Sequence, residues 1–205
     1  MGIFDIFKQK PKINGIIKHL KLEHWWLNEL NDEERRIILS TYSPMGSENS
    51  IIEDDIYYSS QTPLNFFLGL IGWFNKNELR HIAYKLIAKA ESFINAKSDP
   101  LDVHFLYGVK LDMFYKDRDF LPDGLELAIK ACEQQIENSP SAATAFIKKY
   151  GDNLPAHKGY HQLAIVFEKQ KRYIEAISLC KKAKFQGWAG DWDKRIERCN
   201  KRINK

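Results

Sequence analysis

Cysteine is scarce in this chain of 205 residues. The three that occur, Cys132, Cys180 and Cys199, are far apart, and none belongs to a C-x-x-C pair. An odd and scattered set argues against a disulfide framework and against a cysteine-based zinc site, and it is typical of proteins in a reducing compartment. We therefore expect a cytoplasmic protein.

Long apolar runs are also lacking. No stretch approaches the ~20 apolar residues that a membrane span needs, and the N-terminus has no apolar core of signal-peptide length. Residues 1–12 combine a short apolar patch with lysines. This patch could act as a weak anchor to a membrane surface or a partner. So few residues bury little area in a bilayer interface, which favours a docked or frayed terminus instead.

Neither sign of charge dominates the chain. It carries 31 Lys and Arg against 27 Asp and Glu, a net charge of +4, with both signs spread throughout. This is not the footprint of an obligate nucleic-acid binder. The final segment is an exception, because residues 194–205 hold six basic residues and one acidic residue, Glu197.

Catalytic and cofactor motifs are absent from the sequence. It has no G-x-S-x-G, no glycine-rich phosphate loop and no H-E-x-x-H. His157 and His161 are spaced to share a helical face as half of a zinc site, but no third ligand can be assigned. The adjacent carboxylates of residues 53–55 point in different directions, whereas an oxygen-ligand site needs convergent ones. We expect no metal, no cofactor and no enzymatic activity.

Hydrophobic periodicity and helix-start signals predict an all-helical chain. Asn31 and Glu34 form a capping-box pattern, and Thr62-Pro63 places proline at the first position of a helix. Trp25 and Trp26 cannot both face one core in a helix over 13–30. Outside residues 51–58 no segment alternates like a strand. Helices are predicted over 13–30, 31–43, 64–75, 77–95, 101–119, 124–138, 141–150, 173–185 and 191–205, and another starts at Pro155 and carries Tyr160.

The organisation along the chain divides near residue 60. Residues 1–60 are expected to form an N-terminal helical hairpin followed by a loop, and residues 61–205 a helical repeat domain. The loop over 43–62 is rich in Ser, Asn, Gly and Pro. A segment of this length without regular structure is unusual in a compact domain, so it is interpreted as a mobile loop or a functional insertion.

A helical hairpin over 160–183 is the clearest unit in the second part. Small residues stand where two helices must touch, namely Ala164, Ala176 and Ala183. The same spacing recurs from Phe67 to Ala90 and, more loosely, over 111–136. Cys132 and Cys180 occupy equivalent positions in their copies. This equivalence predicts that they are small buried hydrophobic residues and not nucleophiles.

Two glycines and two histidines within the predicted helices are interpreted as structural residues. Gly69 and Gly72 are expected to permit close contact between helices. His81 and His104 are interpreted as hydrogen-bonded structural histidines, because each lies within an apolar helix.

This spacing resembles the tetratricopeptide repeat, in which small residues mark the helix crossing and aromatic residues fill the space around it. The resemblance is best over 157–188, fair over 64–95 and degenerate over 104–138. Trp188 stands where the family usually has proline, and the helix over 141–150 is extra. The expected fold is therefore an all-α, irregular superhelix of stacked antiparallel hairpins with a C-terminal capping helix.

The resemblance implies a scaffold that binds a protein or peptide along a concave face. That face would be lined by the first helix of each hairpin, which makes the groove candidates Asn65, Leu68, Asn75, Lys116, Lys158, His161 and Glu168. An alternative is a nucleic-acid-associated regulator. It would use the basic side of the last helix, formed by Lys194, Arg195, Arg198, Lys201 and Arg202.

Overall fold

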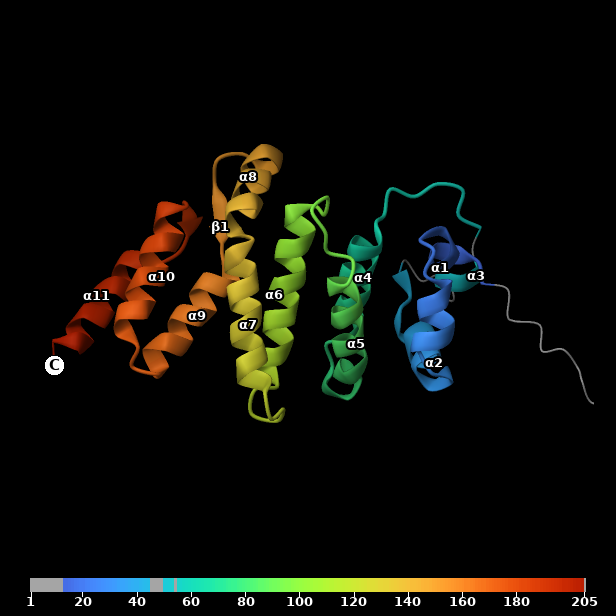
Figure 1. Cartoon of the computed structure of the whole chain (residues 1–205), viewed down its shortest axis with the longest axis horizontal. Helices are drawn as coiled ribbons and strands as arrows, with labels where there is room; N and C mark the ends of the chain where they lie inside the picture. Colours follow the sequence, from blue (N-terminus) through green and yellow to red (C-terminus); the bar gives the residue numbers. More distant parts are fainter. Residues whose placement is uncertain (1–12, 45–49, 54, 205) are drawn as a thin grey trace, which may run out of the picture. The chain divides into compact units, whose positions relative to one another are not determined.

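The computed structural model describes residues 13–44, 50–53 and 55–204, and these are mostly helical (Figure 1). The all-α prediction is therefore confirmed at the level of class. The chain forms two compact units, Met1–Phe66 and Phe67–Lys205, whereas the sequence suggested a division near residue 60. The interpretation of residues 1–12 lies outside the described residues. Within the described ranges, no helix is long and apolar enough to cross a membrane.

The first unit departs from the single helix expected over 13–30. Helix α1 is only Gly15–His19, and Lys21 then adopts a left-handed conformation with φ of 58°. A π-helix, η1, follows at Trp25–Glu29. Trp25 and Trp26 are both buried and meet edge to face, with ring centroids 5.9 Å apart. The prediction that they could not share a core was wrong, because it assumed that only one side of this segment would be buried.

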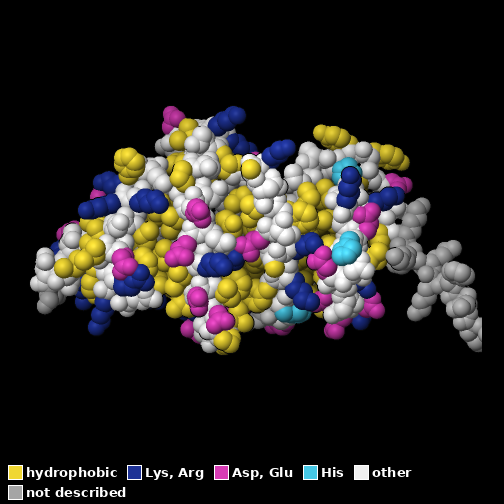
Figure 2. Space-filling model, viewed as in Figure 1, with side chains coloured by type: hydrophobic (Ala, Val, Ile, Leu, Met, Phe, Trp, Pro, Cys, Tyr) yellow, Lys and Arg dark blue, Asp and Glu magenta, His cyan; other side chains and the backbone are white. Residues whose placement is uncertain are grey.

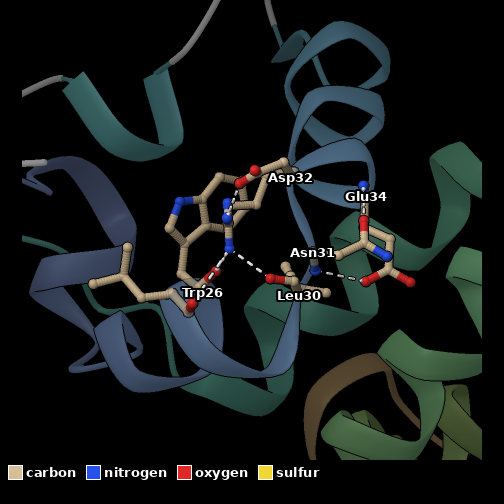
Figure 3. Close-up of polar contacts among 7 residues, drawn as sticks. Trp26, Leu30, Asn31, Asp32 and Glu34 are labelled. Atoms are coloured by element: carbon tan, nitrogen blue, oxygen red, sulfur yellow. Dashed lines mark hydrogen bonds and ion pairs between the residues drawn. The ribbon is translucent and has the colours of Figure 1, made fainter.

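Helix α2, Asp32–Thr41, begins with the predicted capping box (Figure 3). The Asn31 side chain accepts a hydrogen bond from the Glu34 backbone at 2.8 Å, and the Glu34 carboxylate accepts one from the Asn31 backbone at 3.0 Å. Arg35 donates to the carbonyls of Trp26 and Leu30. The start of α2 is thereby tied to the end of η1. Within residues 43–62 the described part also contains α3, Ser50–Glu53.

The second unit is built from pairs of adjacent helices (Figure 1). Helix α4, Pro63–Ile71, contains the boundary between the two units. The elements that follow it are η3 (Gly72–Phe74), η4 (Asn77–Leu79), α5 (Arg80–Glu91), α6 (Pro100–Lys116), α7 (Gly124–Glu137), α8 (Ser139–Tyr150), α9 (Lys158–Lys169), α10 (Tyr173–Phe185) and α11 (Trp192–Ile203). Helix α6 packs along α7, α9 along α10 and α10 along α11, while α7 also contacts α9 and α8 contacts α6.

The small residues that the sequence predicted for the crossing of α9 and α10 are buried. Ala164, Ala176 and Ala183 are each fully buried. Two antiparallel helices can approach closely only where the facing side chains are small. The three cysteines are buried free thiols. Burial raises the pKa of Cys132 to about 12 and that of Cys180 to about 11, which leaves both thiols unreactive.

The glycines that permit close contact are not the ones predicted. A Cβ on Gly69 or Gly72 would meet nothing within 4 Å, so neither marks a helix contact. A Cβ on Gly159 would lie 2.9 Å from the backbone oxygen of Cys132, and one on Gly108 would lie 2.9 Å from Gln135 Nε2. The correct glycines therefore lie on α9 and α6, where these helices contact α7.

One small sheet was not predicted. Strand β1, Leu154–Ala156, pairs in parallel with β2, Trp188–Ala189, and Leu154 lies opposite Trp188. Each strand is shorter than the four or more residues in which an alternating pattern can be recognised. The helix expected to start at residue 155 begins instead at Lys158, after the N-cap His157.

Candidate functional site

Helix α9 carries three of the predicted groove residues, Lys158, His161 and Glu168. Their side chains lie along the helix at a spacing close to its 3.6-residue repeat, so they follow one side of it. Each contacts a neighbouring helix, α6 in one case and α11 in the other two. We call the surface formed by these contacts the α9 face, defined by Asp112, Lys158, His161, Glu168, Arg195 and Arg198.

The junction of α9 with α6 is an exposed ion pair over a glycine. The Lys158 stem passes close to Gly108, with its Cδ 3.8 Å from where a Cβ would stand. Its ammonium group pairs with the Asp112 carboxylate. The two side chains are 56% and 46% exposed, so water screens their attraction and the pair adds little to stability.

The junction of α9 with α11 is a more enclosed cluster. Glu168 accepts hydrogen bonds from both Arg195 and Arg198, the latter at 3.0 Å from Nε. The Arg195 side chain is 6% exposed and that of Glu168 is 18% exposed. Burial alone would raise the pKa of Glu168, but the hydrogen bonds from Arg198 and Arg195 outweigh it and hold the pKa below its usual value. His161 Nε2 lies 3.3 Å from Arg195 Nη2.

Arg195 therefore does not belong to the outward basic side of α11, where the sequence analysis put it. Its guanidinium is directed toward α9, and its Nε has no hydrogen-bond partner among the described residues. The helical positions explain the difference. Arg195 stands about 100° from Lys194 around the helix, on the border between the buried and the exposed sides.

Gln135 of α7 is a buried polar residue that contacts both α6 and the start of α9. Its Nε2 donates to the His104 carbonyl at 2.9 Å, and its Oε1 accepts from the Gly159 backbone at 2.6 Å. One side chain on α7 thus satisfies backbone groups on α6 and at the start of α9. Because buried polar groups need such partners, Gln135 fixes where α9 begins relative to α6.

Two buried histidines, His104 and His157, lie close to the backbone groups that Gln135 binds. His157 is fully buried and caps α9, since its Nδ1 accepts the Tyr160 N–H at 3.3 Å. The two rings are 5.0 Å apart between centroids, and Trp188 stacks on His104 at 5.6 Å.

Both imidazoles are held neutral. Burial lowers the pKa of His104 to about 4, with Lys158 contributing, and lowers that of His157 to about 3, with His104 contributing. His104 Nδ1 and His157 Nε2 have no hydrogen-bond partner among the described residues. The expectation of hydrogen-bonded structural histidines holds only in part, because His104 is buried but packs mainly against aromatic rings, and His81 is exposed.

The zinc half-site suggested by His157 and His161 does not form. His157 is turned into the core, whereas His161 is exposed and lies against Arg195. In the described part of the chain, no group of three or more His, Cys, Asp or Glu could hold a metal ion. Of the acidic residues 53–55, Asp54 lies outside the described residues.

The other predicted groove residues lie on α4, directly after η3 and on α6. Lys116 on α6 donates to Asn75 at 2.9 Å, which connects the end of α6 to the residue after η3. Leu68 is half-buried on α4. Asn65 belongs to the first unit, where its backbone N–H donates to Thr62 at 3.1 Å.

Three residues of the site were missed by the sequence analysis, namely Asp112, Gly108 and Gln135. Asp112 precedes Lys116 by four residues on α6, a spacing that puts both on one side of a helix. That signal was present. Gln135 follows Cys132 by three residues and Ala128 by seven, a spacing that puts this polar side chain on the buried side of α7, so a signal was present there too.

Comparisons with known proteins give no relative for this chain: no protein-family model, no curated protein and no solved structure matches it.

Proposed function

We propose that this protein is a non-enzymatic, cytoplasmic scaffold that binds a peptide segment of a partner protein on the α9 face. In this proposal the helices of the second unit are irregular, tetratricopeptide-like hairpins, with α11 as the cap. The helix contacts support it, because α6 and α7, then α9 and α10, pack as successive pairs and α11 packs on α10. The free, buried thiols support the cytoplasmic location.

The observation that carries the proposal is the Lys158–Asp112 pair. Both side chains are about half exposed, so the fold gains little from their attraction. Their positions are nevertheless well defined, because Gly108 makes room for the lysine stem and Gln135 fixes the start of α9. Charged groups that are held in place but still reach water are suited to pair with a partner's charges at low entropic cost.

An apolar contact is available on the same side of α6, two helical turns before Asp112. Phe105 stands one helical turn before Gly108 on α6, and its side chain is 43% exposed. Its inner edge packs against Phe146 of α8, with ring centroids 5.8 Å apart. A ring that is fixed on one side and open on the other can anchor an apolar side chain of a bound peptide.

The test is selection of random linear peptides displayed on phage against the full chain. Peptides enriched on the native protein should bind the Lys158→Glu variant about tenfold or more weakly, since a charge reversal replaces attraction with repulsion. Lys184→Glu is the matched control. Lys184 forms another exposed ion pair, with Asp193 at 2.7 Å, away from the α9 face.

The control variant is expected to bind the selected peptides as the native chain does. Circular dichroism and urea unfolding should show the same fold for all three proteins. Failure to enrich any peptide on the native chain relative to Lys158→Glu would overturn the proposal. Equal loss of binding in Lys184→Glu would overturn it as well.

A further inference from the structure

Positive charge is concentrated at the C-terminal end of the chain. Residues 181–205 contain nine Lys and Arg against three Asp and Glu, a net charge of +6. The preceding residues carry 22 basic and 24 acidic side chains, so the whole excess of positive charge comes from this segment. Asymmetry of this kind is typical of chains that contact polyanions.

The described part of this segment presents the charge along one side of α11. Lys194, Arg198, Lys201 and Arg202 line a surface depression of about 530 Å³, together with Glu197 and Asn204. The opposite side of the helix is buried through Trp192 and Cys199. In Figure 1, α11 is the outermost helix of the second unit, beside α10, and Figure 2 shows Lys and Arg side chains on the surface of this end of the unit.

Part of this positive charge is not neutralised within the protein. Lys201 pairs with Glu197 at 2.6 Å, and Arg198 pairs with Glu168. For Lys194 and Arg202 there is no ion pair or hydrogen bond with any described residue. Lys194 and Arg202 can therefore each pair with an external anion. Arg198 and Lys201 can do so in part, because their ion pairs with Glu168 and Glu197 are partly exposed to water.

We infer that the outward side of α11 binds the phosphate backbone of nucleic acid, independently of base sequence. From Lys194 to Arg202 the helix advances about 12 Å. A strand of duplex DNA presents one phosphate per ~3.4 Å of axis, so several phosphates fall within that length. Four cations on one side of a helix match a row of phosphates better than they match a single anion.

The same geometry argues against a membrane surface as the partner. An interfacial helix must insert its apolar side among the lipids. The apolar side of α11 is already buried, because Trp192 and Cys199 are enclosed in the unit. This surface shares Arg198 with the α9 face, but its two cations without an internal partner, Lys194 and Arg202, do not belong to that face.

The test is fluorescence anisotropy of the full chain with a labelled, mixed-sequence duplex DNA, a duplex RNA and a single-stranded RNA. At physiological salt, a dissociation constant of about 1 to 100 micromolar is expected, the range typical of non-specific contacts, with tighter binding at low salt. The logarithm of the binding constant should fall with the logarithm of salt concentration with a slope of about −3 for duplex DNA, which corresponds to three or four phosphate contacts.

The decisive variant is Lys194→Glu/Arg202→Glu, since neither side chain takes part in an internal ion pair with a described residue. In this variant the slope of the logarithm of the binding constant against the logarithm of salt concentration should be about 2 less negative, about 1 for each lost phosphate contact. Lys148→Glu/Lys149→Glu changes the net charge equally on the exposed surface of α8 and should bind as the native chain does. Unfolding curves of both variants should match the native one.

Three results would overturn the inference. The first is no binding at low salt by the native chain. The second is an equal loss in the α8 control, which would show a response to net charge alone. The third is tighter binding to phosphatidylserine vesicles or to polyglutamate than to any of the nucleic acids, which would assign the surface to a membrane or to an acidic protein.

Discussion

Helix α9 has two polar junctions with its neighbours, and they differ in how far water reaches them. The Lys158–Asp112 pair with α6 is about half exposed, whereas the Arg195–Glu168 pair with α11 is largely enclosed. An exposed ion pair adds little to stability, because its attraction is offset by the loss of hydration. In a buried ion pair each charge has lost most of its hydration, so removing one partner leaves the other charge unstabilised. We therefore expect that the fold tolerates changes at the first junction and is strongly destabilised by changes at the second.

The largest expected effect is at the enclosed junction. Glu168→Ala should lower the free energy of unfolding by about 3–5 kcal/mol, because it leaves Arg195 as a buried charge without a counter-ion. Urea unfolding monitored by tryptophan fluorescence measures the loss. The double variant Glu168→Leu/Arg195→Met should recover most of it, since it removes both charges. A loss below about 1 kcal/mol in the single variant would mean that this pair behaves like an exposed one.

The second effect concerns the histidines beneath the exposed junction. His104 and His157 are neutral in the folded chain, with pKa values of about 4 and about 3, whereas both titrate near 6.5 when unfolded. The unfolded chain thus binds more protons below pH 6.5. Stability is full above that pH and is lost as the pH falls, by about 2 kcal/mol per histidine near pH 5.

Urea unfolding over this pH range checks the histidine prediction. His104→Phe should remove about half of the pH dependence, because it retains the stacking on Trp188 without a titrating group. An unchanged slope in this variant would assign the pH dependence to other groups.

The third effect tests the close approach of α9 to α7. Gly159→Ala should cost about 1–3 kcal/mol, because its Cβ would stand 2.9 Å from the Cys132 carbonyl oxygen, which cannot move freely. Gly69→Ala is the matched change in open space on α4 and should stabilise the chain by up to about 1 kcal/mol. Thermal unfolding compares the two variants. Similar shifts in both would contradict the proposed role of Gly159.

The smallest effect is expected at the exposed junction itself. Lys158→Ala and Asp112→Ala should each change the free energy of unfolding by less than about 1 kcal/mol. Lys184→Ala, which removes another exposed pair, should fall in the same range. A double-mutant cycle of Lys158 and Asp112 gives the coupling energy directly. Coupling as large as that of Glu168 and Arg195 would remove the distinction between the two junctions.

Much of the fold followed from local patterns in the sequence. Helix-start signals identified the capping box at Asn31 and the start at Pro63, and periodicity located α9 and α10 with their buried alanines. These features depend on residues within one or two helical turns. The tetratricopeptide-like arrangement and the groove remain proposals.

The errors arose where distant contacts decide the outcome. Whether a glycine marks a helix contact depends on which helices cross there, so Gly108 and Gly159 could not be told from Gly69 and Gly72. Arg195 stands on the border of its helix, and the position of Glu168 on α9 determines its direction. The sequence spacing placed His157 on a polar helical surface as a possible ligand. In the structure it is the N-cap of α9, directly after strand β1, and it is buried.

The parallel pairing of β1 with β2 has a consequence for how the chain opens and closes. Because Leu154 lies opposite Trp188, the segment entering the α9–α10 hairpin and the segment leaving it are held side by side. The hairpin is thus a closed loop, whose ends can separate only when the strand hydrogen bonds break. Hydrogen exchange should show its two helices becoming accessible together, as one cooperative unit. The entropy of closing such a loop grows only slowly with its length, so insertions at the turn after Lys169 should be tolerated.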